Sequence, residues 1–319
     1  RFYSENDGKN YYSPGCETVD AAEKLCERRA LHAFPGSEHV NVKLNDGTRG
    51  NEAACMAVLK DGETILSLDL SCGGHLSHGL KSNYSGIRYK IVNYGVEPDG
   101  LLNYEKIRAL AREHRPRLII AGGSSFSRQF DFGAFQSIAK EVGALMHADN
   151  SHFAGLVAAG LYPSPFPHAK AVCLAEVSSE PFREEMRRVK DNASHLCGLF
   201  KEAGYTIISG GTDTHLFVID LRPKEIEGRE AQRRLQAVNI LANKQGIPYD
   251  PKPPTIGSGL RIGTPCASAR GMSRPEMETL FGLIHEALGS AGERPDLLAR
   301  VSELGRRFPV PDMDVEPCP

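Results

Sequence analysis

The sequence predicts an α/β protein, with an open parallel sheet covered by helices and a smaller α+β domain after it. Helices and strands alternate, with glycine turns between them, through residues 40–152, as they do in parallel sheets. Three prolines within residues 163–167 end this pattern ahead of a long helix. The 319 residues exceed what one hydrophobic core usually organises, so we expect two domains, residues 1–180 and 181–319.

The first half of the chain supplies the sheet, and hydrophobic periodicity defines its elements. In order, the pattern predicts a helix at 15–33, a strand at 39–44, a glycine turn at 45–51, a helix at 52–59, a strand at 64–70, and helix–strand units at 104–123 and 132–152. Open α/β sheets bind ligands outside the carboxyl ends of their strands. The polar strand ends at Cys72, Ser124 and Asp149 should therefore converge on one cleft.

The second half of the chain has a different pattern, with longer helices and isolated strands. The expected elements are a helix at 181–203, strands at 205–211 and 215–222, a helix at 230–246, a loop at 248–265, and a last helix at 275–288. This order is typical of a small α+β domain.

Composition excludes several classes of protein. Lys and Arg (38) nearly balance Asp and Glu (40), and the net charge of -2 argues against a nucleic-acid or anionic-membrane partner. No apolar run approaches the length of about 18 residues that a membrane span needs, and the first residues contain no apolar signal core. The eight cysteines show no metal-ligand spacing and are expected to be reduced thiols. We expect a soluble, cytoplasmic protein.

Two features of the first half indicate a site for a charged ligand. Asp149 ends an apolar strand, where a carboxylate is out of place unless it meets a cation or hydrogen-bond donors, although a buried loop cap is an alternative. The turn at 45–51 is similar to a phosphate cradle, because Gly47 and Gly50 let backbone N–H groups converge and Thr48 adds a hydroxyl. Most such turns are only turns.

Histidines and an arginine add to this set. His75 and His78 lie three residues apart in a glycine-rich loop; a metal is one interpretation, but no third ligand lies at a suitable spacing. Arg261 stands among Ser, Gly and apolar residues in the expected loop, where a guanidinium needs an anion and can bind a carboxylate through two hydrogen bonds. A structural Asp partner is the alternative for Arg261.

Together these segments resemble one family, the glycine/serine hydroxymethyltransferases, which are pyridoxal-phosphate (PLP) enzymes with the aspartate-aminotransferase-like fold (fold type I). The matching stretches span nearly the whole chain in the family's order: KNYYSPGCETVD, GGHLSHG, AREHRPRLIIAGGSSFSR, DNSHFAGLVAAGLYPSP, SGGTDTHLFVIDLRPK and SGLRIGTP. The resemblance implies a large PLP-binding domain at 1–180 and a small C-terminal domain at 181–319.

The resemblance also implies roles for single residues. Asp149 would pair with the pyridine nitrogen of PLP and keep the ring an electron sink. His152 would lie beside the ring, although Ser151 replaces the family's alanine, and Cys72 stands where the family stacks a histidine on the ring. Ser124 and Thr48 would hydrogen-bond PLP or its phosphate.

The substrate side follows from the same resemblance. Arg261 would hold the substrate carboxylate, and His75 is a further candidate catalytic residue. Glu5 matches the glutamate that exchanges a proton with the substrate hydroxyl. Tyr3 and Tyr12 match active-site tyrosines that can serve the partner subunit's site, which implies a homodimer.

Three further departures from the family lie at the cofactor and folate walls. Asp46 replaces a phosphate-side serine, where a carboxylate repels a phosphate unless it turns away. Arg49 replaces a glutamine and could compensate for Asp46. Gln245 replaces an asparagine of a folate-contacting loop.

The largest departure is an absence. After PSPFPHA the family continues into a segment of roughly 55 residues that includes the Schiff-base lysine, whereas this chain passes directly to KAVCLAEVSSEPFREE; Lys170 belongs to that later context and is not assigned the catalytic role. Either the printed sequence omits residues of a longer protein or the protein lacks the lysine. The family's N-terminal arm is missing as well. We favour the first explanation, because the chain begins at Arg1 and both missing stretches belong to one cofactor site.

The sequence therefore predicts a PLP-dependent enzyme that cleaves or forms the Cα–Cβ bond of a β-hydroxy-amino acid, with tetrahydrofolate as the one-carbon acceptor. One alternative is a threonine aldolase or transaldolase of secondary metabolism, favoured by Cys72, Asp46 and Gln245. A second alternative is a catalytically inactive homologue that acts as a binding subunit.

Overall fold

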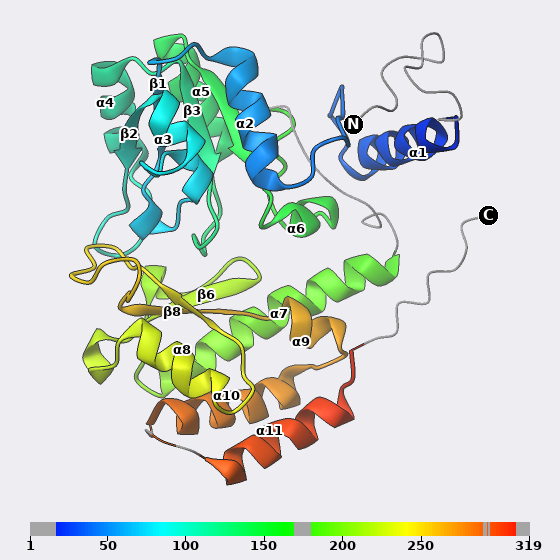
Figure 1. Cartoon of the computed structure of the whole chain (residues 1–319), viewed down its shortest axis with the longest axis vertical. Helices are drawn as coiled ribbons and strands as arrows, with labels where there is room; N and C mark the ends of the chain where they lie inside the picture. Colours follow the sequence, from blue (N-terminus) through cyan, green and yellow to red (C-terminus); the bar gives the residue numbers. More distant parts are fainter. Residues whose placement is uncertain (1–16, 169–179, 290–291, 293, 311–319) are drawn as a thin grey trace.

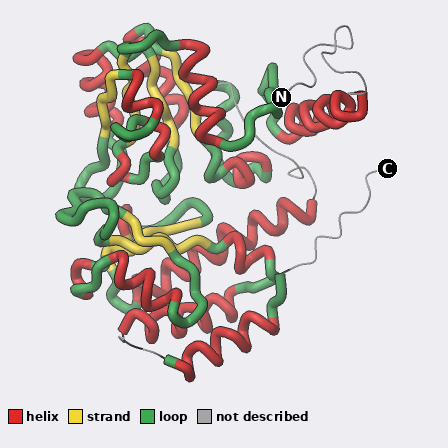
Figure 2. The backbone as a smooth tube through the Cα atoms, in the orientation of Figure 1, coloured by secondary structure: helices red, strands yellow, loops and turns green. Residues whose placement is uncertain are grey.

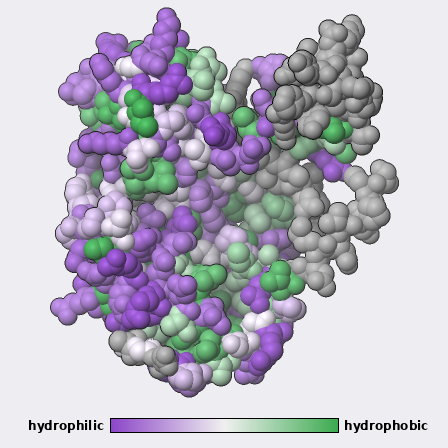
Figure 3. Space-filling view, in the orientation of Figure 1, coloured by the Kyte–Doolittle hydropathy of each residue, from purple (hydrophilic) through white to green (hydrophobic). Residues whose placement is uncertain are grey.

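The computed structural model describes residues 17–168, 180–289, 292 and 294–310, and two separate sheets organise them. In Figure 1 the residues of the first sheet form the upper body and those of the second sheet the lower body. No helix in the described ranges is long and apolar enough to cross a membrane. The molecular face drawn in Figure 3 is mainly hydrophilic, with its hydrophobic residues in small, separate groups.

The first sheet has four parallel strands in the order β2-β1-β3-β4. Its strands are β1 (Thr64–Leu68), β2 (Lys90–Tyr94), β3 (Leu118–Gly122) and β4 (Leu145–Asp149). The helices of this body are α1 (Glu17–Ala33), α2 (Gly47–Val58), α3 (Tyr84–Arg88), α4 (Tyr104–His114), α5 (Phe132–Val142) and α6 (Ala154–Ala158). The expected α/β architecture with a parallel sheet is therefore present.

Both faces of this sheet are buried, as helix-covered parallel sheets require. Along β3, Ile119 and Ala121 pack into one core cluster, while Leu118 and Ile120 pack into another on the opposite face. Because side chains alternate along a strand, the apolar run predicted the buried strand correctly. The helix–strand units α4–β3 and α5–β4 are also where the sequence predicts them.

The second sheet is antiparallel, in the order β5-β6-β8-β7. Its strands are β5 (Thr206–Ile207), β6 (Leu216–Asp220), β7 (Asn243–Gln245) and β8 (Gly259–Gly263), and its helices are α7 (Glu180–Glu202), α8 (Gly228–Gln236), α9 (Pro265–Ala269), α10 (Arg274–Gly289) and α11 (Pro295–Arg307). Figure 2 shows most of these helices on the side of the sheet away from the upper body. Phe200, Phe217 and Leu260 lie in the core between sheet and helices.

A seam joins the two bodies, formed by residues 124–128 after β3 and residues 209–213 before β6. The Ser127 and Ser209 hydroxyls lie 2.8 Å apart, and Arg128 Nε donates to Ser209 O at 3.0 Å. Arg128 Nη1 also pairs with Asp213 Oδ1 at 3.2 Å. The seam places the carboxyl ends of the parallel strands opposite the second sheet.

Two expectations for the segment before β1 were wrong. Residues 39–44 form no strand, since no neighbouring strand pairs with their alternating pattern. The expected turn at 45–51 is instead the start of α2, because the Asp46 side chain accepts a hydrogen bond from Arg49 N at 2.9 Å and caps the helix. Thr48 consequently lies in the first turn of a helix.

Other expectations failed where pairing between distant segments decides the structure. The expected loop at 248–265 contains β8, which pairs with β6 and β7, and the expected helix at 230–246 ends at Gln236 so that 243–245 can pair as β7. The sequence prediction missed β2. It also named 275–288 as the last helix, although α11 follows it.

Candidate active site

The carboxyl ends of β1, β3 and β4 meet, as the sequence predicts. Gly122, the last residue of β3, pairs with Asp149 at the end of β4. Ser124 N donates to Gly73 O at 2.9 Å, which joins the loops after β3 and β1. A Cβ on Gly73 would lie 2.7 Å from Phe126 N, so only glycine allows the two loops to approach this closely.

Asp149 is the centre of this convergence, buried and fully hydrogen-bonded. Its Oδ2 accepts from Asn51 Nδ2 and lies against His78 Nε2, each at 2.8 Å. Its Oδ1 accepts from the Ser151 hydroxyl at 2.6 Å and from Ser151 N at 3.1 Å. Burial favours the neutral acid, but the hydrogen bonds, that from His78 foremost, hold the pKa of Asp149 well below its usual value. The site therefore contains a fixed negative charge.

Asn51 connects Asp149 to Ser77 and His147. Its Nδ2 also donates to the Ser77 hydroxyl at 2.9 Å, and its Oδ1 lies 2.8 Å from His147 Nε2. Because the amide oxygen faces His147, the Nε2 atom of that ring carries the proton. Burial lowers the pKa of His147 to about 4, so the ring is neutral at ordinary pH.

His75 and His78 lie beside the carboxylate. Their rings meet edge to face at 5.6 Å, and His75 Nδ1 lies 2.8 Å from the Ser77 hydroxyl. Burial, and then the neighbouring His78, lower the pKa of His75. The sequence argument that no third metal ligand accompanies the histidines was wrong, because ligand atoms of His75, His78 and Asp149 lie within 4.8 Å of one another. In this structure the facing atoms of His78 and Asp149 hydrogen-bond directly.

A cavity of about 450 Å³ opens next to the two histidines. Both apolar and polar groups line it: Leu68, Asp69, Leu70, His75, His78, Gly79, Leu80, Lys81, Gly86, Tyr89, Ile91 and Asn93. The hydrogen-bonded network around Asp149 thus borders a space large enough for a small ligand.

The N-terminus of α2 approaches Asp149 from the other side. A Cβ on Gly47 would lie 3.2 Å from Ser151 Oγ, so the helix start and the Asp149 loop touch. Asp46 is exposed and engaged as the helix cap. The Arg49 guanidinium pairs with Glu52 at 2.5 Å, and its compensation of Asp46 toward a phosphate stays a prediction.

Cys72 and Ser124 lie in the loops that follow β1 and β3. Burial raises the pKa of the Cys72 thiol, which is therefore protonated, and a Cβ on Gly95 would meet its Sγ at 3.6 Å. The Ser124 hydroxyl donates to Gly74 O at 3.0 Å and keeps its lone pairs.

Arg261 belongs to the second body, and its side chain contacts the loop after β3. It lies in the middle of β8, opposite Val218, rather than in the expected loop. Its Nη1 donates to Ser124 O at 3.1 Å and to Ser125 Oγ at 3.3 Å, and its Nη2 donates to Asn243 Oδ1 at 3.2 Å. No carboxylate of the described residues pairs with it, and burial lowers the pKa of the guanidinium.

Gln245 lies in β7 rather than in a loop, and it contacts Ser125, as Arg261 does. Its Oε1 accepts from the Ser125 hydroxyl at 2.9 Å, and Ser125 in turn meets Arg261. His152 follows Asp149 in the same loop, with its side chain exposed. Tyr3, Glu5, Tyr12 and Lys170 lie outside the described residues.

Sequence reasoning missed Asn51, Ser77 and His147 as members of the site. His147 carries the one available signal, since residues two apart on a strand share a face and Asp149 lies two positions on. In the sequence, Asn51 is an ordinary polar helix residue. In the structure it is only 4% exposed and contacts the Asp149 carboxylate, 98 positions away in the sequence.

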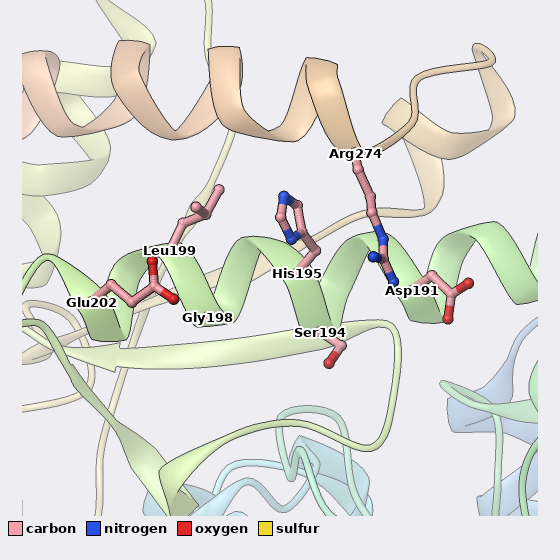
Figure 4. A pocket seen from close by; sticks show the side chains of 7 residues that line it. All are labelled: Asp191, Ser194, His195, Gly198, Leu199, Glu202 and Arg274. Atoms are coloured by element: carbon pink, nitrogen blue, oxygen red, sulfur yellow. The ribbon is translucent and has the colours of Figure 1, made fainter.

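A separate hollow of about 350 Å³ lies along α7 and contains none of the predicted site residues. Figure 4 shows Arg274 extending from the start of α10 toward α7, and His195 directed between the two helices. Its lining is Asp191, Ser194, His195, Gly198, Leu199, Glu202 and Arg274. The hollow takes no part in the network around Asp149.

Two comparisons with known proteins agree with this geometry. The family model described as serine hydroxymethyltransferase matches residues 2–174 and 168–284. A protein of Kineococcus radiotolerans described as serine hydroxymethyltransferase is 40% identical over 357 residues, covering 95% of this chain and 82% of that protein.

The same comparisons locate a gap. The alignment spans 357 positions, whereas 95% of 319 residues is about 303, so roughly 54 positions of the alignment have no residue in this chain. The two matches of the family model meet at residues 168–174. This is the junction at which the sequence predicts a missing segment.

Proposed function

Because the chain belongs to the serine hydroxymethyltransferase family, we propose that its residues bind PLP and convert serine to glycine with tetrahydrofolate as acceptor. The chain is a transferase of the hydroxymethyltransferase type, acting on the Cα–Cβ bond of a β-hydroxy-amino acid. The comparisons do not favour an aldolase, a transaldolase or an inactive subunit. The observation that carries the cofactor proposal is the buried, ionised Asp149 at the meeting point of three strands.

The residues at this edge fit the ring of PLP. When bound, PLP supplies an electron sink for a carbanion at the amino acid's α-carbon. Asp149 would hold the proton on the pyridine nitrogen, since its own pKa is too low for it to take that proton. His152 would lie beside the ring, Ser124 would contact the cofactor, and Thr48 at the start of α2 would face the phosphate.

Two side chains oppose this fit locally. Ser151 donates to Asp149 Oδ1 at 2.6 Å and so occupies an acceptor that a pyridinium would use. Asp46 places a carboxylate at the helix end where a phosphate would gain from the positive dipole. Both residues replace smaller or neutral residues of the family, and both therefore weaken the binding of PLP.

The substrate carboxylate would bind to Arg261. The guanidinium has five N–H donors, of which the protein uses three, so two remain for one carboxylate. His75 stays a candidate catalytic residue, and Glu5 a candidate for exchanging a proton with the substrate hydroxyl. Tyr3 and Tyr12 stay candidates at the partner subunit's site.

We further infer fold type I, a domain division near residue 180, a homodimer and a cytoplasmic location. The two sheets, each with its own buried core, support the division. The free thiols of the described cysteines, Cys26, Cys55, Cys72, Cys197 and Cys266, agree with a reducing compartment.

The test uses the full chain in three measurements. Intact mass is compared with 34.8 kDa, PLP binding is titrated by absorbance, and serine-to-glycine conversion is followed with and without tetrahydrofolate. We expect conversion that requires both PLP and folate, and its loss in Asp149→Asn. Threonine cleavage without folate would instead support the aldolase. A mass of 34.8 kDa with no turnover of either substrate would support the inactive homologue.

A further inference from the structure

His215, a residue with no role so far, lies at the start of β6 and is stacked on His152. The two ring centroids are 6.2 Å apart and the ring planes differ by 14°. His152 is exposed at the cleft, whereas His215 is partly covered. The two rings are nearly parallel and within the range at which stacked rings interact, and the His152 side chain is otherwise exposed.

The backbone holds His215 firmly in this position. His215 O accepts from Thr264 N at 3.0 Å, and the next residue, Leu216, pairs with Gly263 of β8. Arg261 lies two residues before Gly263 on the same strand. His215 immediately precedes β6 and Arg261 lies in the neighbouring strand β8, while His152 comes from the other body.

The ring of His215 carries a buried polar atom that the described residues do not satisfy. Its Nδ1 is inaccessible to solvent and makes no hydrogen bond to them. A buried polar group without a partner destabilises the fold, so a residue that keeps one in a cleft needs an explanation. An apolar ring would fill the same space without this cost.

Groups of both signs act on the stacked pair, with Asp149 near His152 and Arg261 acting on both rings. Desolvation, and then Arg261, lower the pKa of His152, while Asp149 raises it and His75 lowers it slightly. Burial, and then His152 and Arg261, lower the pKa of His215 to about 4. Among residues 17–168, 180–289, 292 and 294–310, no carboxylate contributes to the pKa shift of His215. Both shifts favour the uncharged imidazole, and His215 is neutral at ordinary pH.

We propose that His215 is a positioning residue of the active site, whose partly buried ring supports the His152 imidazole and sets its orientation beside Arg261. This inference rests on the proposed function, because His152 and Arg261 are the groups expected to meet PLP and the substrate carboxylate. A ring fixed on one side loses little freedom when a ligand takes the other side. His215 acts through His152 and touches no reacting atom.

The experiment compares His215→Phe, which keeps a ring without titrating nitrogens, with His215→Ala, which removes the ring. The full chain, labelled with ¹³C at histidine, is titrated by NMR with and without PLP, and glycine affinity is measured from pH 5 to 8. His152→Gln is titrated in parallel. The control is His285→Gln, because His285 also stacks on an aromatic ring, Phe281 at 5.6 Å, but belongs to α10.

We expect His152→Gln to raise the pKa of His215, because a neighbouring positive charge is removed, and His285→Gln to leave it unchanged. His215→Ala should shift the titration of His152 and weaken glycine binding by about two- to tenfold, the range one ring pair contributes. His215→Phe should keep most of the affinity but change its pH dependence below pH 6.

Independent titration of His152 and His215 would overturn the proposal, and so would unchanged titration of His152 in both His215 variants. If His215→Ala fails to fold, the histidine titrations of His152→Gln and His215→Phe still test the proposal. If the wild-type chain does not bind glycine, the proposed function fails, while the coupling between the two histidines remains measurable by NMR without it.

Discussion

Replacing Arg261 by alanine tests the placement of the substrate carboxylate. The protein uses three of the five N–H donors of this guanidinium, and two remain for an anion. Charge-assisted hydrogen bonds contribute about 1.5–3 kcal/mol each, so losing two removes about 3 kcal/mol or more. Glycine or serine should then bind roughly a hundredfold more weakly, since 1.4 kcal/mol is a factor of ten.

Two other properties should change little in Arg261→Ala. The variant loses hydrogen bonds to Ser124, Ser125 and Asn243, but it also removes a half-buried cation that has no carboxylate partner among the described residues. These effects oppose each other, so the melting temperature should stay close to that of the wild type. PLP affinity should also persist, because Asp149 and α2 belong to the other body.

The assay is a calorimetric titration of glycine into the PLP-loaded chain, preceded by a titration of PLP itself. Arg261→Lys keeps the charge without the planar fork and should bind glycine with intermediate affinity. Arg222→Ala is the matched control, since Arg222 lies next to β6 but pairs with Asp220 at 2.7 Å. Loss of PLP or of folding in Arg261→Ala, with normal glycine affinity in the folded fraction, would refute the reasoning.

Three other predictions follow from contacts around the site. Ser151→Ala frees an acceptor of Asp149, so PLP should bind roughly tenfold more tightly in an absorbance titration, and unchanged affinity would show that Ser151 does not compete with PLP. Asp46→Ser keeps a helix cap but removes a negative charge, so PLP should bind more tightly and its affinity should depend less on salt concentration. Equal PLP affinity in the variant and the wild type would mean that the Asp46 carboxylate turns away from the phosphate. The free energy of unfolding should fall as pH drops from 6.5 to about 4, because the unfolded chain takes up protons at His147 and His215 that the folded chain does not. Each histidine accounts for on the order of 3 kcal/mol of this loss. In His147→Gln, the free energy of unfolding measured with denaturant should depend less on pH.

The parts of the fold that could be predicted are those that local periodicity determines. The units α4–β3 and α5–β4 follow from a helical apolar stripe and then an apolar run, and each structure agrees with its pattern. The strand β8 could not be found in this way, because its glycines and the prolines before it indicate a loop. Pairing with β6, some forty residues away, makes it a strand.

The site shows the same division. Asp149 and Arg261 were found because a charge in an apolar stretch needs a partner, and this argument uses only neighbours in sequence. Asn51 and His147 have ordinary neighbours. Their importance lies in the hydrogen bonds that β4 and α2 make possible, and no local signal contains that information.

The seam between the two bodies has a consequence for affinity. Asp149 belongs to the first sheet and Arg261 to the second, so the distance between these two side chains depends on how the two bodies meet. Hydrogen bonds among Ser127, Arg128 and Ser209 join the two bodies at the seam. If Asp149 and Arg261 bind the cofactor and the substrate carboxylate as proposed, the joint between the bodies sets the length of amino acid that fits, and selection for a longer or shorter substrate can act there while every proposed ligand-contacting residue stays the same.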